Sequence, residues 1–200
     1  MSPVVIDLNC PTCGAAIPAG AKECEYCGRP LVIQNVTTIL DLDDVQIKRY
    51  TNTYKKLLDE DPSNPEIWKA IGITQLKLGL YPAADKSFTQ AAEFCFDDGD
   101  IHFYLAITKL GGKRPAFVKR NELDLALQEL EAASGIEEKG IYEYLAAVIT
   151  FDYFARKGFN IRPNYSEHMD SAKQRGYSES DVLALNELMK VDTNHLPSID

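Results

Sequence analysis

Four of the five cysteines lie between residues 10 and 27, as two Cys-x2-Cys pairs: Cys10 with Cys13, and Cys24 with Cys27. Each pair is followed by a glycine, which can take the positive φ of a tight turn and leave backbone N–H groups facing the sulfurs. Because a two-residue gap lets both thiolates of such a turn bind one ion, two turns complete a tetrahedral site of four sulfurs. The spacing therefore predicts one structural Zn²⁺ ion with no open position for water. Iron in a rubredoxin-like site and disulfide bonds are the less favoured alternatives.

The segment around these cysteines, about residues 8–34, resembles a short zinc ribbon. The resemblance implies a small domain, predicted as residues 1–36, whose folding energy comes from the metal because the segment is too short to build a core. Residues 31–40 are rich in Val, Ile and Thr and predict its last strand running into a linker. Zinc ribbons commonly bind nucleic acids or proteins. Here acidic residues outweigh Lys22 and Arg29, which disfavours binding to phosphates.

A second pattern occupies residues 65–96, where large and small apolar residues recur at fixed spacings. Their order is Trp68, Ile71, Gly72, Ala84, Phe88 and Ala91. A small residue lets two helix backbones approach, and a large one fills the space between neighbouring pairs of helices. One repeat length further on, His102, Leu105 and Ala106 keep the order of large, large and small. The pattern predicts antiparallel helical hairpins that repeat along the chain.

Residues 65–96 resemble a tetratricopeptide (TPR) unit, whose signature is W-x2-L-G-x2-Y followed by A-x3-F. Weaker copies follow it. A helix at about 43–60, with Asp41 as its N-cap, and a C-terminal helix at about 178–190 are expected to close the two ends. The predicted fold class is mainly α: a small zinc ribbon, then an α-solenoid of TPR-like helical hairpins over residues 37–200 with a C-terminal capping helix.

The TPR resemblance implies a concave groove lined by the first helix of each hairpin, where members of this family bind extended or helical peptides. The groove positions carried over to this sequence are Lys69, Ile73, Leu76, Lys77, Phe103, Ile107 and Leu110. Their mixed apolar character disfavours the polar carboxylate clamp of some TPR proteins. Two occupants are equally open: an amphipathic segment of a protein partner, or the chain's own C-terminal helix.

An insertion between the two helices of the second unit has the sequence GGKRPAFVKRNEL. It carries Lys113, Arg114, Lys119 and Arg120 with no acidic residue between them, in a chain whose formal net charge is -9. A solvated loop is the simplest interpretation. The alternative is a docking loop for an acidic partner or a phosphate, because insertions in repeat arrays map to one face of the array.

Charge and hydropathy restrict the classes of function. The net charge of -9 and the sequence pI of about 4.9 disfavour binding of nucleic acids or anionic membranes by the whole surface. No apolar run approaches the ~20 residues that span a bilayer, and the N-terminus lacks the pattern of a signal peptide. We therefore expect a cytoplasmic protein that does not associate with membranes.

These patterns together predict a non-enzymatic adaptor or scaffold with a structural zinc site and a TPR-like groove that recruits a partner protein or peptide. No Ser/His/Asp or Cys/His arrangement and no glycine-rich phosphate loop can be argued from spacing. The alternative is a nucleic-acid-associated regulator that uses the ribbon and the basic loop 113–120. A weaker third hypothesis is an enzyme whose site lies in the groove.

Overall fold

The computed structural model of the chain describes residues 8–18 and 21–191. The outer ends of both predicted domains, residues 1–7 and 192–200, lie outside the described residues, as do residues 19–20. Within the described ranges, the helices lack the combination of length and hydropathy that a membrane span requires.

The cysteine-rich segment forms a minimal β-hairpin followed by a second turn. Strand β1 (Leu8–Asn9) pairs antiparallel with β2 (Ala16–Ile17), and Glu23 forms an isolated bridge with Pro30. The strand expected over residues 31–40 is wrong. This stretch is irregular and then forms the short 3-10 helix η1.

The physical reason is that the segment packs against helices and not against another strand. Helix η1 spans Val36–Ile39, and its two end residues are buried together with Ile33 in the same hydrophobic core as the helices. Its neighbouring backbone finds hydrogen-bond partners on a tyrosine side chain, described below, so no ladder is needed. The domain boundary at residue 36 stays a prediction.

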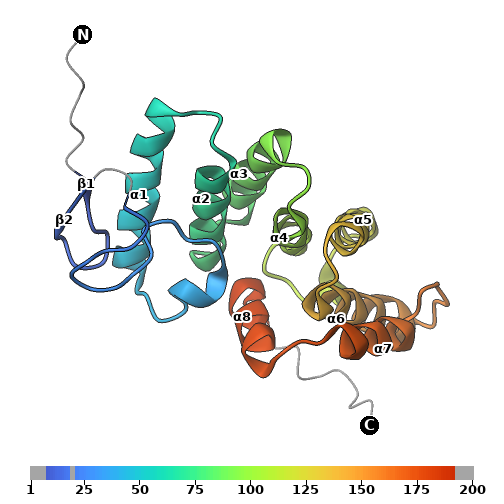
Figure 1. Cartoon of the computed structure of the whole chain (residues 1–200). Helices are drawn as coiled ribbons and strands as arrows, with labels where there is room; N and C mark the ends of the chain where they lie inside the picture. Colours follow the sequence, from blue (N-terminus) through green and yellow to red (C-terminus); the bar gives the residue numbers. More distant parts are fainter. Residues whose placement is uncertain (1–7, 19–20, 192–200) are drawn as a thin grey trace.

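Eight α-helices follow within the described residues and make the protein mainly α. They are α1 (Asp44–Glu60), α2 (Pro65–Lys77), α3 (Tyr81–Phe94), α4 (Gly99–Leu110), α5 (Arg120–Ile136), α6 (Gly140–Ile149), α7 (Tyr165–Arg175) and α8 (Glu179–Met189). Helix α2 packs on α3, α4 on α5 and α6 on α7, which gives three helical hairpins. Contacts of α1 with α2, α3 with α4 and α5 with α6 join them into one TPR-like array (Figure 1).

The small residues of the predicted repeat lie where helices approach each other. Gly72 of α2 lies so close to the ring of Phe88 in α3 that a Cβ atom there would come within 2.6 Å of it. Ala84 and Ala91, on the same face of α3, are fully buried. The alternation of small and large residues therefore acts as predicted: Gly72 lets the backbone of α2 come close to α3, and the ring of Phe88 fills the space between the two helices.

The helix predicted at about 43–60 is confirmed as Asp44–Glu60, but its N-cap differs by two residues from the predicted Asp41. Its N-cap is Asp43, whose side chain accepts a hydrogen bond from the Gln46 N–H at 2.8 Å, while the Gln46 side chain accepts from the Asp43 N–H. This reciprocal pair is a capping box, with Gln in the place often taken by Glu. Asp41 instead forms an ion pair with Arg29, so it connects the cysteine-rich segment to the helices.

Candidate functional site

The two Cys-x2-Cys turns have the same backbone geometry. The N–H of Gly14 donates to the carbonyl of Cys10, and the N–H of Gly28 donates to that of Cys24, both at 2.8 Å. Gly14 and Gly28 have φ of 78° and 66°, the left-handed conformation that this turn requires. The repetition produces two equivalent knuckles that present their sulfurs to a common centre.

The four cysteine sulfurs all lie within 4.8 Å of one another. The Sγ–Sγ distance is 3.6 Å for Cys10 and Cys27, and 3.6 Å for Cys13 and Cys24. A disulfide would need about 2.05 Å, whereas a tetrahedron with Zn–S bonds of about 2.3 Å has edges of about 3.8 Å. The N–H groups of Cys27 and then Tyr26 lower the pKa of Cys24 to about 7, whereas burial and the neighbouring sulfurs raise the pKa of Cys13 and Cys27. The four thiols therefore do not ionise together without a cation, and a metal ion would have to displace their protons. The distances between the four sulfurs fit a Zn²⁺ ion.

A protein-family model described as a zinc-ribbon domain matches residues 9–31. This segment is a zinc ribbon. A comparison of the whole sequence with curated proteins finds no match. Among solved structures, the chain is similar to one titled "MamA MSR-1 C2", with 16% sequence identity and a TM-score of 0.48, over 70% of this chain and 72% of that chain.

Two buried tyrosines of α1 hold the ribbon against the helices. The Tyr54 hydroxyl accepts a hydrogen bond from the Ile33 N–H and donates to the Leu31 carbonyl, both at 3.0 Å. The Tyr50 hydroxyl lies 2.9 Å from that of Thr12, inside the first knuckle. Burial raises the pKa of both phenols, so both stay protonated and able to donate. In the sequence these tyrosines lie one helical turn apart, but nothing local shows that their hydroxyls reach the ribbon.

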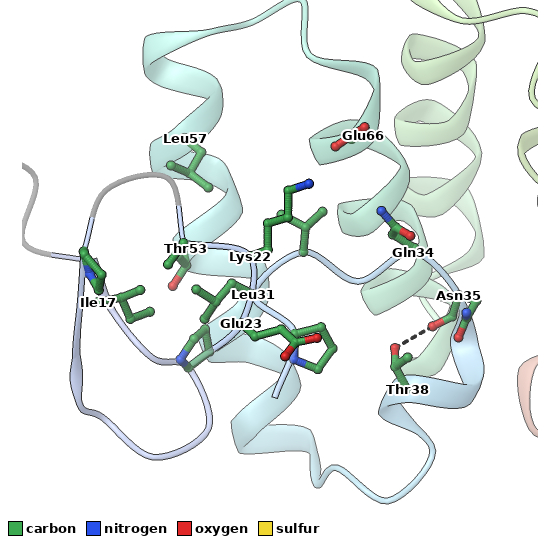
Figure 2. A pocket seen from close by; sticks show the side chains of 15 residues that line it. Ile17, Lys22, Glu23, Leu31, Gln34, Asn35, Thr38, Thr53, Leu57 and Glu66 are labelled. Carbon is green, nitrogen blue, oxygen red and sulfur yellow. Dashed lines mark hydrogen bonds between the residues drawn. The ribbon is translucent and has the colours of Figure 1, made fainter. Parts of the chain in front are cut away.

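A cleft of about 630 Å³ separates the outer part of the ribbon from the helices. Ile17 and Leu31 line it from the ribbon side, Thr53 and Leu57 from α1, and Glu66 from the start of α2 (Figure 2). The ribbon therefore contacts α1 through Tyr50, Tyr54 and the residues that directly follow the ribbon, and not over its whole face.

The predicted groove residues lie in the core of the molecule. Ile73, Leu76 and Ile107 are fully buried, and Phe103 and Leu110 are at most 6% exposed. Helix α8 contacts α2, α4 and η1, and Figure 1 shows it (red) beside these elements. Of the two occupants left open by the sequence, the structure contains the chain's own C-terminal helix.

Polar contacts fasten α8 in this position. Lys77 Nζ lies 2.9 Å from Glu187 Oε1, and the Tyr81 hydroxyl donates to the Leu188 carbonyl at 2.9 Å. Lys69, the other predicted groove lysine, lies 2.7 Å from the N-cap aspartate of α4. Both lysines are therefore engaged inside the molecule.

The basic insertion is shorter than expected, residues 111–119, because α5 begins at Arg120. Arg120 is thus helical and not a loop residue, and its Nε lies 2.7 Å from Asp124 Oδ1, one turn further on. Lys113 and Lys119 are exposed and have no ion-pair partner in the part of the chain that the structure describes. The four basic residues therefore do not form a single free cluster.

Arg114 instead anchors the insertion to the third hairpin. Helix α6 continues into a π-helical turn, η3 (Thr150–Phe154), in which the side chain of Asp152 is completely buried. Its carboxylate accepts hydrogen bonds from Arg114 at 2.5 Å, from the Ala116 N–H at 3.0 Å and from Arg156 at 3.1 Å. Burial alone would raise the pKa of Asp152, but these hydrogen bonds hold the pKa below its ordinary value. Sequence reasoning missed this aspartate because it lies 38 residues from Arg114.

A second carboxylate, the partly buried Glu143 of α6, lies in a cavity of about 500 Å³ between α5, α6 and α7. It is 2.7 Å from His168 Nδ1, 3.0 Å from Ser134 Oγ and 3.1 Å from Arg175. The hydrogen bond from His168 is the main reason why the pKa of Glu143 is lowered. Ser134 donates to the glutamate and not to the histidine, so the three side chains lack the order of a nucleophilic triad. Their contacts join three helices.

Proposed function

We propose that this protein is a non-enzymatic, cytoplasmic adaptor that recruits a partner protein through its TPR-like array, with one structural Zn²⁺ ion in the ribbon. The closed set of four sulfur ligands supports a structural metal, because a catalytic zinc keeps a position open for water or substrate. Four reduced thiols also suit the cytosol.

The observation that supports the proposal is the position of α8, which packs against α2 and α4 and which we call its seat. An amphipathic helix lies across the first helices of two hairpins, where its Leu185 and Leu188 are buried and Leu183 is exposed. The array thus already binds a helix in the manner of helix-in-groove recognition. We infer that an amphipathic helix of the partner takes the same seat, at Lys69, Ile73, Leu76, Lys77, Phe103, Ile107 and Leu110, when α8 is released.

The proposal is tested by affinity capture from a lysate of the source cell, with and without nuclease. A variant with Leu185→Asp and Leu188→Asp should loosen α8 and retain more of a defined, nuclease-resistant protein than the wild type. Leu183→Asp on the exposed side of the same helix is the matched control and should behave as the wild type. A turnover abolished by one point mutation would contradict the non-enzymatic assignment.

The alternative function is nucleic-acid-associated regulation through the ribbon and the basic insertion. It is favoured by Lys113 and Lys119, which lack carboxylate partners among the described residues. It predicts that retention vanishes with nuclease and that binding of nucleic acid falls steeply as the salt concentration rises. A complex that survives nuclease at physiological salt would count against it.

A further inference from the structure

Two segments that are distant in sequence meet at the third hairpin and form one basic surface. The first is the insertion after α4, and the second is the turn η4 (Ala155–Lys157) that follows η3. They are joined by the shared aspartate described above and by Lys157 Nζ, which lies 3.3 Å from the Ala116 carbonyl. We call this the basic surface and define it by Lys113, Arg114, Phe117, Lys119, Arg156 and Lys157.

The charges of the basic surface are not balanced by its own acids. Asp152 is one carboxylate shared by two guanidinium groups, those of Arg114 and Arg156. Lys113, Lys119 and Lys157 have no carboxylate partner in the described ranges, although Lys157 also lies over the ring of Tyr153 at 3.6 Å. The surface therefore carries an excess of positive charge in a chain whose net charge is -9.

An exposed aromatic ring lies beside one of these charges. Phe117 is 75% exposed, and the guanidinium of Arg114 lies 6.0 Å from its ring centroid. Beside it, the N-cap of α5 is Lys119, which makes no side-chain cap hydrogen bond. The N–H groups of Glu122 and Leu123 donate to the Lys119 carbonyl, so among the described residues those of Arg120 and Asn121 remain for an acceptor. An exposed ring, three lysines without carboxylate partners among the described residues and a helix start without a side-chain cap are complementary to a segment with carboxylates and at least one large apolar side chain.

We propose that the basic surface docks an acidic peptide segment of a partner protein that carries a large apolar residue. This inference rests on the proposed adaptor function and adds a second contact, remote from the seat of α8. Charge complementarity decides the choice of occupant. A nucleic-acid duplex would extend beyond this small patch over a surface that is acidic as a whole and would be repelled there.

The buried Asp152 gives the surface its rigidity. Its hydrogen bonds with Arg114, the Ala116 N–H and Arg156 fix both segments to the core, so little conformational entropy is lost when a peptide binds. Lys113 and Lys119 take no part in this anchor, and Lys157 adds only one exposed contact of 3.3 Å to the Ala116 carbonyl. Changing the three lysines therefore leaves the hydrogen bonds of Asp152 in place.

The test is a selection of random short peptides, displayed on phage, against the full-length zinc-loaded protein. The peptides selected by the wild type should be enriched in Asp and Glu with a Leu, Ile or aromatic residue. Their affinity should fall by about tenfold or more in a variant with Lys113→Glu, Lys119→Glu and Lys157→Glu, because charge pairs across an interface are lost and reversed. Phe117→Ala should also weaken the binding.

The matched control changes three exposed lysines of α1, with Lys48→Glu, Lys55→Glu and Lys56→Glu, and so makes the same change in net charge. It should leave the affinity within about twofold of the wild type, and both variants should keep the wild-type circular dichroism and zinc content. Selected peptides without an acidic bias, or equal losses in both triple variants, would overturn the inference but not the adaptor function. Tighter binding of a polythymidine oligonucleotide than of the selected peptides would overturn it in favour of nucleic acid, and an empty selection would count against both proposals.

Discussion

The zinc ribbon buries little of itself: Cys10 and Cys24 are each 2% exposed, whereas Cys13, Cys27 and most of their neighbours reach solvent. The helical hairpins bury whole faces of apolar side chains, among them Ile73, Leu76 and Phe88. In the first region a few coordinate bonds replace a core, and in the second many weak contacts form one. The comparison sets a segment whose fold we expect to depend on metal binding against helices whose fold depends on packing.

The two regions are nevertheless connected. Tyr50 and Tyr54 of α1 hold the ribbon by hydrogen bonds, and Arg29 of the ribbon pairs with Asp41. Ile33, just after the ribbon, is buried among the helices. Four changes test how far the ribbon and the hairpins depend on each other, and each should affect one region more than the other.

The largest effect is expected from Cys13→Ser. It removes one of four ligands from a site whose binding free energy in comparable structural zinc peptides is about 10–16 kcal/mol. The ribbon should lose its zinc and its protection from hydrogen exchange, while the hairpins should keep most of their far-UV circular dichroism. Zinc content, exchange mass spectrometry and circular dichroism measure these three outcomes.

The control for this change is Cys95→Ser, which replaces a cysteine outside the metal centre and should leave the zinc content unchanged. In the Cys13→Ser variant, only local loosening is expected in α1, because Tyr50 and Tyr54 lose their ribbon partners there. Loss of most of the helical signal in Cys13→Ser would mean that the two regions fold as one unit.

Gly140→Ala should give the largest effect in the hairpins. A Cβ atom at Gly140 would meet the backbone carbonyls of Gly176 and Ala172, the latter at 2.5 Å, and backbone atoms cannot move aside as a side-chain tip can. We expect a loss of about 3 kcal/mol in the free energy of unfolding, at the upper end of typical overpacking costs. The zinc content should not change.

The matched control is Gly135→Ala in α5, where a new Cβ would meet nothing within 4 Å. It should stabilise the protein by about 0.5–1 kcal/mol, because alanine loses less conformational entropy in a helix. Urea denaturation followed by circular dichroism measures both variants. Equal stabilities for the two would show that the contact of α6 with α7 is not as close as the structure has it.

Tyr54→Phe tests the connection between the regions. It leaves the buried Ile33 N–H and the Leu31 carbonyl without their hydroxyl partner, which should cost about 2 kcal/mol. Tyr26→Phe, on a side chain that is 77% exposed, should cost almost nothing. In the Cys13→Ser background the cost of Tyr54→Phe should shrink, and an undiminished cost would show that this hydrogen bond does not need a folded ribbon.

Glu143→Gln should have the smallest effect, about 1 kcal/mol at neutral pH, since the amide keeps the shape but loses the charge opposite His168 and Arg175. The pKa of Glu143 is lowered in the folded protein, so the stability it contributes is complete above the unfolded pKa of about 4.3 and is lost as the pH falls through the folded value. The difference between wild type and variant should therefore disappear in acid.

The control for this change is Glu138→Gln, which alters an exposed carboxylate in the same part of the chain. Acid should also affect the two regions differently, because protons compete with zinc for the thiolates of the ribbon. Zinc release on acidification should be the same in Glu143→Gln and in the wild type. An earlier release in the variant would reveal a coupling between the third hairpin and the ribbon that the structure does not suggest.

Local patterns made much of this fold predictable from the sequence. The spacing of Cys10, Cys13, Cys24 and Cys27 predicted two knuckles, because each turn involves residues a few positions apart. The series from Trp68 to Ala91 predicted a hairpin for the same reason. Two predictions that relied on a single local signal were wrong: Asp41 as an N-cap and a strand over residues 31–40. In both cases a partner distant in the sequence decided the structure instead, Arg29 for Asp41 and the helices for residues 31–40.

The sequence by itself determined the elements: a four-sulfur metal centre, three helical hairpins and a helix at each end of the array. Only the tertiary structure decided that α8 packs against α2 and α4, that Tyr54 holds the ribbon and that Asp152 joins two distant segments. The physical reason is the range of the interactions. Helix periodicity and turn geometry act within a few residues, whereas the partner of a buried hydroxyl or carboxylate depends on which surfaces meet when the whole chain is packed.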